Sequence, residues 1–524
     1  SDFCKEEYMD WTEGYESGVQ YPVAFHREQS PAYLNFTCVL NGVEPVDTGK
    51  PFTYFELGFG RGLTVTLLAA SNPQGDFYAC DFNPAHVVGA QELAGSAGLA
   101  NLTLLENSFA ELAAGKVPGL PQFDFITMQG VYTWVNAENR AHIVEFIRRH
   151  LKPGGIVYTG YNAMPGWSVA LPLQRMLLEY TGLNPRCPDA GVKEAIDFVA
   201  GMNDSGAKYF SVSMEIEARV AMMQDSNAGY LVHEYLHRGW QPLYFADVAR
   251  DFARAKLDYA GSCALPSAFP ELCLAADKQA LLDTISDPIV RETFRDYMFN
   301  TNFRKDVFVR GARRIPPIKE KEWLQRIGLA LTVPRGKVCL NVKVPIGTVA
   351  LDKQLYQPLL DALEARPHSL AELAVLPKLK GQPTRVLWQA AALLTATERA
   401  APYFTDDANH ATDSAHKLNR ALAARMRHAV DYEAFASPLL GTGVEASPRE
   451  RLMYLAAFGK AQEQEEDPRA IARLVMQAAV ASGRELGANG KPYASEAECL
   501  NALTVDAKTL LTVTLPIWRQ LKIV

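Results

Sequence analysis

A glycine-rich turn between two short apolar segments constrains the fold of this chain more than any other feature. Residues 54–62 read Tyr-Phe-Glu-Leu-Gly-Phe-Gly-Arg-Gly, and Asp81 follows a second apolar segment, residues 77–80. A strand, a glycine turn, a helix and a second strand that ends in an acid form the nucleotide-binding half of a doubly wound α/β sheet. The glycines let the backbone approach a ligand closely, and the acid accepts hydrogen bonds from ribose hydroxyls. The pattern therefore predicts a site for a nucleoside-containing ligand.

The spacing of this turn separates it from a dinucleotide site. Its pattern is Glu-x-Gly-x-Gly-x-Gly, formed by Glu56, Gly58, Gly60 and Gly62, and differs from Gly-x-Gly-x-x-Gly. A carboxylate at Glu56 disfavours a pyrophosphate, whereas it attracts S-adenosylmethionine, which carries a sulfonium and an ammonium and no phosphate. The turn therefore favours the methyl donor S-adenosylmethionine over NAD. A glycine turn without any ligand is the alternative, because short glycine motifs occur widely.

The segment from residue 123 onward has the pattern of the second half of the same fold. Residues 123–130 form an apolar, β-branched run that ends at a glycine, and Asn136 is a suitable N-cap for the helix that follows. The helix is expected to end at Lys152-Pro-Gly-Gly, and residues 156–160 read as a further strand. This order resembles the later half of the class I methyltransferase pattern. We therefore predict a Rossmann-like α/β fold for residues 51–167.

Composition and charge exclude several classes of protein. The 524 residues are 48% hydrophobic and 21% charged, a balance typical of a globular chain. No apolar run is long enough to span a bilayer and the N-terminus lacks an apolar signal core, so we expect no membrane insertion. The eight cysteines include no Cys-x-x-Cys pair or Cys/His cluster, which predicts no metal site and favours the reducing cytoplasm. A net charge of −7 without a broad basic run argues against nucleic acid and suits a basic partner.

The chain is too long for one ordinary domain, and shifts in pattern divide it into five expected regions. An N-terminal cap, residues 1–50, precedes the Rossmann-like core, and an acceptor-side regulatory region, residues 168–315, follows it. Residues 316–405 are predicted to form a winged-helix-like module, and residues 406–524 a mainly helical domain. The elements expected in the module are strands at 329–333 and 338–344 and helices at 355–365, 370–375 and 384–396.

Several motifs, taken together, resemble one bacterial family. They include Gly130-Val-Tyr-Thr-Trp-Val, Tyr161-Asn-Ala-Met-Pro-Gly-Trp, His233-Glu-Tyr-Leu and the pair Arg295-Asp-Tyr and Phe303-Arg. The chain resembles the bacterial class I methyltransferases with an appended methyltransferase regulatory domain, a group that includes the rickettsial lysine methyltransferases of outer-membrane proteins. The resemblance covers residues 15–310 and implies S-adenosylmethionine as cofactor and methyl transfer as activity. Gln129 stands where that family tends to have histidine.

Donor-binding residues are expected at the carboxyl ends of the parallel strands, where open α/β sheets bind ligands. The three glycines of the turn would lie against the methionine part and the ribose, and Glu56 near the donor's amino group. Asp81 would bind both ribose hydroxyls, and Phe82 would flank the adenine, with packing in the core as its alternative role. The remaining donor contacts are expected after the third strand and at the end of the fourth, at Asn107, Ser108, Phe109 and Gln129.

Catalytic residues are expected on the acceptor side of the same edge. Aromatic faces favour a cation, so a funnel of aromatic side chains would hold a lysine beside the sulfonium. The residues predicted for this side are Tyr132, Trp134, Tyr161, Asn162 and Tyr235, with His233 either relaying a proton or capping a helix. His26 could face the cleft, although a single histidine is more often structural.

The leading hypothesis is a protein N-methyltransferase that acts on lysine, with a lysine-bearing protein as its partner and a homodimer as a further assembly to consider. Methyl transfer from a sulfonium is an in-line displacement, so the protein mainly supplies proximity and alignment. Two alternatives stay open: a small-molecule or peptide-natural-product methyltransferase, and a non-catalytic regulator that binds the donor. Residues 1–310 are expected to bind the donor without the C-terminal third, because every donor motif lies within them.

Overall fold

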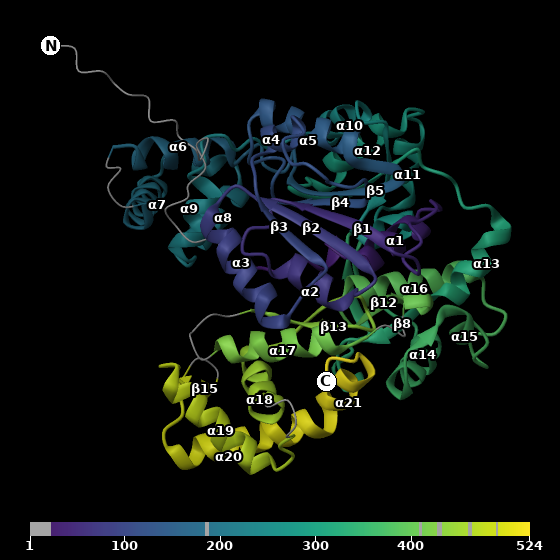
Figure 1. Cartoon of the computed structure of the whole chain (residues 1–524). Coiled ribbons are helices and arrows are strands. Elements are labelled where there is room, and N and C mark those ends of the chain that lie inside the picture. The colour runs from purple at the N-terminus through teal and green to yellow at the C-terminus, as the bar shows by residue number, and fades with distance from the viewer. Residues whose placement is uncertain (1–22, 184–187, 408–410, 427–431, 460–463, 489–490) are drawn as a thin grey trace.

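A seven-stranded mixed sheet forms the centre of the protein (Figure 1). The computed structural model describes residues 23–524 except 184–187, 408–410, 427–431, 460–463 and 489–490. The strands of the central sheet are β1 (Phe52–Leu57), β2 (Gly75–Asp81), β3 (Leu102–Glu106), β4 (Phe123–Gln129), β5 (Leu151–Asn162), β6 (Leu257–Ser262) and β7 (Phe303–Arg310). They lie in the order β3-β2-β1-β4-β5-β7-β6. The first five run parallel, and β7 is antiparallel to both β5 and β6.

The strand order reverses at β1, which confirms the predicted Rossmann-like fold. β2 and β3 lie on one side of β1, whereas β4 and β5 lie on the other. The carboxyl ends of β1 and β4 therefore flank a crevice, where sheets of this kind bind ligands. Neighbouring residues of β1 face opposite layers, because Phe52 and Tyr54 belong to one buried cluster, and Phe55 and Leu57 to another.

Helices cover both faces of this sheet (Figure 1). One face carries α4 (Phe109–Ala113), α5 (Ala137–His150), α10 (Phe245–Ala253) and α12 (Pro288–Phe299), and the other α1 (Pro31–Leu40), α2 (Leu63–Ser71) and α3 (Pro84–Ala97). The local signals of α5 act as predicted, because the Asn136 side chain accepts a hydrogen bond from the backbone N–H of Asn139. Its apolar residues Ile143 and Ile147 are fully buried against the sheet.

The core extends beyond the predicted boundary at residue 167. β6 and β7 come from residues 257–310, which the sequence placed in a separate acceptor-side region, and they complete the central sheet. β7 pairs with β5 from Ile156 opposite Val309 to Asn162 opposite Phe303, so that β5 is no longer an edge strand. Pairing between strands this distant in the chain leaves no local signal, so the predicted boundary is wrong.

A helical insertion separates β5 from β6. It consists of α6 (Leu171–Thr181), α7 (Pro188–Asp204), α8 (Met214–Gln224) and α9 (Ala228–Tyr235), which share a hydrophobic cluster of their own. α5 ends at His150, just before Lys152-Pro-Gly-Gly as predicted, and β5 begins at Leu151, so that this segment itself lies inside β5. The pairing of β4 with β5 shifts register there, so the glycines accommodate a bulge.

The predicted winged-helix-like module contains a small antiparallel sheet and three helices. The sheet order is β11 (His368–Ser369), β8 (Ile327–Leu331), β12 (Ala400–Phe404). The helices are α14 (Lys353–Ala365), α15 (Leu370–Ala374) and α16 (Thr384–Ala396), in agreement with the expected positions. The single strand expected at 338–344 is instead the first arm of a hairpin, β9 (Asn341–Val344) and β10 (Gly347–Ala350). α13 (Pro317–Arg326) connects β7 of the core with β8, whereas α11 (Ala276–Asp283) lies between β6 and α12.

The C-terminal domain packs directly on the core helices. Its elements are α17 (Asp413–Arg425), β13 (Ala434–Ser437), β14 (Thr442–Glu445), α18 (Pro448–Phe458), α19 (Pro468–Ala481), β15 (Gly487–Ala488), β16 (Lys491–Pro492), α20 (Glu496–Thr509) and α21 (Leu515–Gln520). α17 lies against α2 and α3 (Figure 1), where Leu418 and Leu422 share a buried cluster with Leu67 and Leu93. Gly443 of β14 permits this approach, since a Cβ there would lie 2.8 Å from the ring of Phe25.

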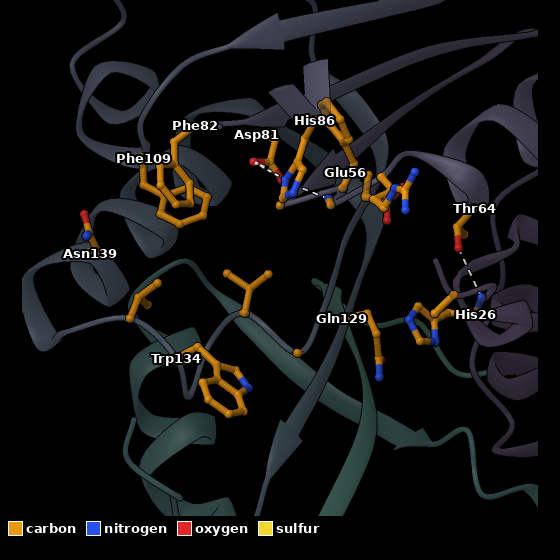
Figure 2. A pocket seen from close by; sticks show the side chains of 18 of the residues that line it. His26, Glu56, Thr64, Asp81, Phe82, His86, Phe109, Gln129, Trp134 and Asn139 are labelled. Atoms are coloured by element: carbon orange, nitrogen blue, oxygen red, sulfur yellow. Dashed lines mark hydrogen bonds and ion pairs between the residues drawn. The ribbon is translucent and has the colours of Figure 1, made fainter. Parts of the chain in front are cut away.

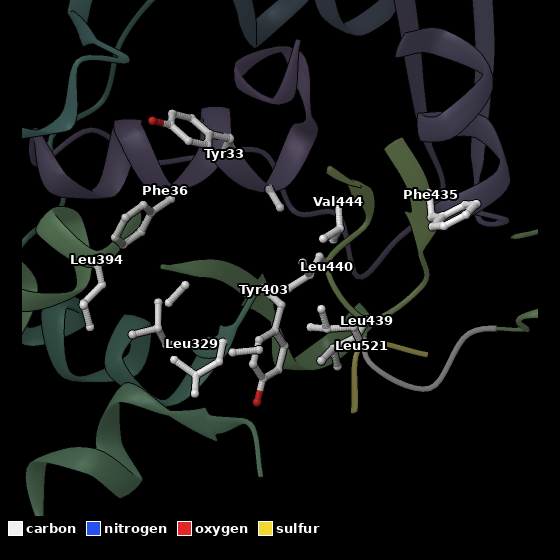
Figure 3. Packing of buried hydrophobic residues seen from close by; sticks show 14 of the residues in the cluster. Tyr33, Phe36, Leu329, Leu394, Tyr403, Phe435, Leu439, Leu440, Val444 and Leu521 are labelled. Atoms are coloured by element: carbon white, nitrogen blue, oxygen red, sulfur yellow. The ribbon is translucent and has the colours of Figure 1, made fainter. Parts of the chain in front are cut away.

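Three regions of the chain meet in one continuous hydrophobic core. Figure 3 shows Tyr33 and Phe36 of α1 opposite Tyr403 of β12, with Leu440 and Val444 of the C-terminal domain beside them. Truncation after the central sheet would expose this apolar surface to water. No helix within the described ranges is both long and apolar enough to cross a membrane.

Candidate active site

A pocket of about 150 Å³ lies at the carboxyl ends of β1, β2 and β4 (Figure 2). Each of these strands ends in a polar lining residue: Glu56, Asp81 and Gln129. The other predicted donor contacts that line it are Gly58, Gly60, Phe82, Asn107, Ser108 and Phe109. The pocket therefore occupies the switch point of the sheet and gathers residues that lie far apart in the sequence.

The glycine turn has a backbone conformation that a residue with a side chain could adopt only with strain. Gly58 and Gly62 have φ angles of +69° and +75°, and a Cβ on them would lie 2.7 Å from Val131 Cγ2 and 2.6 Å from Ala90 Cβ. Gly60 also has a positive φ, +56°. Gly62 does not line the pocket, because it is the N-cap of α2 and faces α3. The predicted contact of Gly62 with a ligand is thus corrected to a packing role.

Asp81 links the turn to the end of β2. Its Oδ2 accepts a hydrogen bond from the backbone N–H of Gly60 at 2.8 Å, and its Oδ1 accepts from the backbone N–H of Asn83 at 3.0 Å. Nδ1 of His86 lies 3.2 Å from Oδ1. A carboxylate accepts about four hydrogen bonds, so about one position on Oδ2 stays open toward the pocket. The geometry suits one ribose hydroxyl at Oδ2. It leaves little room for a hydrogen bond from the second ribose hydroxyl, which the sequence analysis also assigned to Asp81.

Aromatic rings mark one end of the pocket. Phe82 and Phe109 lie together in Figure 2, each following the carboxyl end of a strand. Ser108 caps α4 and accepts from the backbone N–H of Glu111, while Asn107 donates through Nδ2 to the Glu111 carboxylate at 3.3 Å. Asn107 therefore keeps its carbonyl oxygen available for the edge of a base. Two rings and an amide at this end suit an adenine.

Glu56 is a buried acid on the other side of Asp81 from the two aromatic rings. Its side chain is 3% exposed, and Oε1 accepts from Nε2 of Gln29 at 3.1 Å. Oε2 makes no hydrogen bond to the residues that the structure describes. Burial, together with the nearby Asp81, raises the pKa of Glu56 to about 8. An acid with one unmatched oxygen fits an ammonium group on a ligand.

The N-terminal segment supplies one wall of the pocket. His26 lines the pocket beside Gln129, and its backbone N–H donates to Thr64 Oγ1 at 3.1 Å (Figure 2). Burial, opposed by Glu28 and assisted by the Lys305 ammonium, lowers the pKa of His26 to about 4. The imidazole is therefore neutral at pH 7, and of the two roles expected for His26 the one at the cleft is observed.

Residues 23–27 separate the pocket from a second cavity. Ala24 and His26 line the first pocket, whereas Val23, Phe25 and Arg27 line the second, of about 660 Å³. This alternation is the period of an extended segment. The Arg27 guanidinium donates to the carbonyls of Thr395 and Ala396 at the end of α16.

Gln129 is held in one orientation. The Tyr158 hydroxyl donates to Gln129 Oε1 at 2.6 Å, and burial keeps that hydroxyl protonated by raising its pKa far above the usual range. The side-chain amide lies against Gly160 of β5, where a Cβ would come within 2.0 Å of Oε1. Gly160 thus makes room for the amide, and Nε2 of Gln129 is left for the pocket.

Trp134 is the predicted acceptor-side residue that does line the pocket. Its ring lies 5.7 Å from the ring of His237, which also lines the pocket, and 6.1 Å from Trp240. Burial lowers the pKa of His237 to about 4, so this imidazole is also neutral at pH 7. Trp134, His237 and His26 form what we call the neutral wall of the site.

The other five predicted catalytic residues lie outside the pocket lining. Tyr161 is fully buried and donates to Asp306 at 2.7 Å, within a buried cluster around Arg304. Tyr132 is also fully buried and donates to Asp251 at 2.9 Å. Their assignment to the acceptor is wrong for this structure, because β7 covers the end of β5 and the α10 helix covers Tyr132.

The remaining three predicted catalytic residues are also buried. Asn162 is 5% exposed at the end of β5, and its backbone N–H donates to Thr133 Oγ1. Tyr235 is 1% exposed in the helical insertion, where its hydroxyl accepts from Arg219 at 3.2 Å. His233 is 9% exposed on the same helix, α9. The assignment of Tyr235 to the acceptor is corrected to packing, because the helical insertion folds its aromatic side chains into its own core. His233 lies in the last turn of α9, the position that its helix-capping alternative requires.

Comparison with known proteins identifies the family. A methyltransferase domain matches residues 55–157, and a predicted methyltransferase regulatory domain matches residues 227–310. The uncharacterized protein sll1526 of Synechocystis is 35% identical over 98% of this chain and 100% of its own length. The chain belongs to the class I S-adenosylmethionine-dependent methyltransferases that carry a methyltransferase regulatory domain. The regulatory region of this methyltransferase supplies β6 and β7 of the central sheet.

Rickettsial proteins are further relatives of this methyltransferase. The uncharacterized protein RP789 of Rickettsia prowazekii is 24% identical over 55% of this chain and 50% of its own length. The structure of PKMT2 from Rickettsia typhi in complex with AdoHcy aligns with a TM-score of 0.67 and 16% identity, covering 95% of this chain and 99% of that one. At this identity, the likeness shows that the fold is shared over nearly the whole chain.

S-adenosylmethionine is the cofactor of this class, and the pocket residues fit it. Phe82, Phe109 and Asn107 would hold the adenine, and Asp81 a ribose hydroxyl. The unmatched Oε2 of Glu56 would receive the ammonium. When bound, the donor would supply an activated methyl group in the pocket that the neutral wall also lines.

Proposed function

We propose that this methyltransferase transfers the methyl group of S-adenosylmethionine to the amine of lysine side chains in a protein. The neutral wall formed by Trp134, His26 and His237 carries the proposal. An indole face attracts a lysine ammonium, and the two imidazoles add no positive charge at pH 7. The lysine must lose its proton before attack, which costs about 4–5 kcal/mol for a free side chain at pH 7. A partly desolvated wall beside a sulfonium lowers the pKa of that amine and reduces this cost.

Two features beyond the pocket support a protein acceptor. The chain carries a net charge of −7, which favours association with a lysine-rich segment. The described residues of 316–524 do not line the donor pocket, although α17 and β13 share a buried cluster with the core helices α2 and α3. We propose that this region docks the protein substrate. The six described cysteines are free, which suits the reducing cytoplasm that we propose as its compartment.

Transfer of a labelled methyl group into a bacterial lysate tests the proposal. The wild-type chain is incubated with lysate and labelled S-adenosylmethionine, and mass spectrometry then identifies the labelled species. The control is Trp134→Ala, which keeps the donor residues and removes the indole of the neutral wall. Label on protein lysines that falls in the control supports the proposal. Label in low-molecular-weight material alone would establish the small-molecule alternative, and no label with intact donor binding would establish a regulator.

A further inference from the structure

The Glu56 carboxyl has surroundings that do not support a negative charge. It lies at the end of β1, 3% exposed, with a single side-chain donor, Nε2 of Gln29. The backbone N–H of Val65, in the first turn of α2, is the further polar group that acts on it. Oε2 is unmatched within the described part of the chain. A buried carboxylate with one strong hydrogen bond and an unmatched oxygen is costly, whereas a neutral acid is tolerated.

Neighbouring groups add no compensating cation. Asp81 on β2 is a second acid close enough to raise the pKa of Glu56, to about 8 when combined with burial. Cys80 on the adjacent strand β2 and Tyr54 on β1 itself are fully buried, and burial keeps both in their neutral, protonated forms by raising their pKa. On the pocket side, His26 is neutral at pH 7, and the Arg61 guanidinium is not among the groups that shift the pKa of Glu56. Among the described residues, the site thus presents two acids and no cation that shifts the pKa of Glu56.

We infer that Glu56 holds a proton in the donor-free protein and exchanges it for the ammonium group of the donor when the donor binds. The neutral acid loses its proton to solvent, and the resulting carboxylate pairs with the ammonium through Oε2. One O–H bond breaks, one ion pair forms, and one proton leaves the protein. The inference stands on the donor pocket alone, so it holds whether the acceptor is a protein lysine or a small molecule.

This exchange makes donor affinity depend on pH in a defined direction. With a pKa of about 8, Glu56 is about nine-tenths protonated at pH 7, so binding should release about 0.9 proton per site. Affinity should therefore fall about tenfold as pH drops from 7 to 6, because a larger share of the protein must first lose the proton. A site whose acid is already ionised at pH 7 would show neither effect.

Calorimetry of the full-length protein with S-adenosylhomocysteine tests the exchange. Titrations at pH 7 in phosphate and in Tris, two buffers with different heats of ionisation, give the number of protons released. The matched variant is Glu56→Gln, which has the same shape and no titratable proton. The matched ligand is 5′-methylthioadenosine, which lacks the amino acid part and should release no proton from the wild-type protein.

Release of about 0.9 proton with S-adenosylhomocysteine, and near zero with both controls, is the expected result. Zero release by the wild-type protein would overturn the inference, as would equal release by Glu56→Gln. Equal release with 5′-methylthioadenosine would also overturn it, and this arm decides the question even where Glu56→Gln binds too weakly to measure. The ligand's own amine titrates identically with both proteins, so it cancels in the comparison.

Discussion

Substitution of Gly58 by alanine should damage the donor pocket through one identified contact. Gly58 has a φ of +69°, and a Cβ there would lie 2.7 Å from Cγ2 of Val131, a buried residue of the pocket wall. The backbone strain costs roughly 1–2 kcal/mol, and the overpacking adds about 1–3 kcal/mol. Because Val131 follows β4 and lines the pocket, its displacement should also weaken donor binding.

A second glycine separates the strain from the contact. Gly98 has a φ of +64°, and a Cβ on it would meet nothing within 4 Å. Gly98→Ala should therefore lower the midpoint of thermal unfolding slightly and leave the affinity for S-adenosylhomocysteine unchanged, whereas Gly58→Ala should lower both. In a Val131→Ala background the clashing methyl group is absent, so Gly58→Ala should cost less affinity there than in the wild-type background. Equal losses of affinity in the two backgrounds would refute the reasoning.

Four further predictions follow from the same geometry. Asp81→Asn should weaken S-adenosylhomocysteine binding by about 1.5–3 kcal/mol, because a charge-assisted hydrogen bond to the ribose is lost, and calorimetry showing unchanged affinity would remove the ribose assignment. Trp134→Ala should raise KM for the acceptor more than it changes donor affinity, whereas Tyr161→Phe should lower the unfolding midpoint and leave kcat unchanged; steady-state kinetics that reverse this pattern would restore Tyr161 to the site. A chain ending at residue 310 should lose donor binding or precipitate, since α2 and α3 would lose their contact with α17, and a soluble, donor-binding fragment would show that the C-terminal domains are dispensable. Burial raises the pKa of Glu56 from 4.5 to about 8 in the folded donor-free protein, so its contribution to stability is complete below pH 4.5 and is lost as pH rises through 8; thermal unfolding between pH 6 and 8 should decline more in the wild type than in Glu56→Gln.

The predicted donor contacts and the observed pocket agree because most of the signals are local. Gly58 and Gly60 serve one tight turn, and Asp81 reaches that turn through a hydrogen bond to the Gly60 backbone. Phe82 and Phe109 each follow a strand end, and parallel strands bring those ends to one edge of the sheet. Such features lie within a few residues of a strand end, so their chemistry can be read before the chain is folded.

The acceptor side was predicted poorly because its residues are selected by distant packing. Tyr161 lies at the carboxyl end of β5 and Tyr132 follows β4, as acceptor residues should, yet both are fully buried. The antiparallel pairing of β7 with β5 covers the first, and α10 covers the second. In the sequence, His26 precedes β1 and His237 follows β5, and the chain between them has no motif that predicts that both line one pocket.

The sequence by itself determined the Rossmann-like core, the donor, and the positions of most helices, since glycine turns, N-caps and apolar periodicity act over a few residues. Only the tertiary structure decided that residues 257–310 complete the central sheet and that α17 rests on the helices behind the donor pocket. It also decided which aromatic and histidine side chains face the ligand. The physical reason is that burial and strand pairing depend on contacts between distant segments, and these contacts also set the pKa values of Glu56, His26 and His237 on which the proposed chemistry rests.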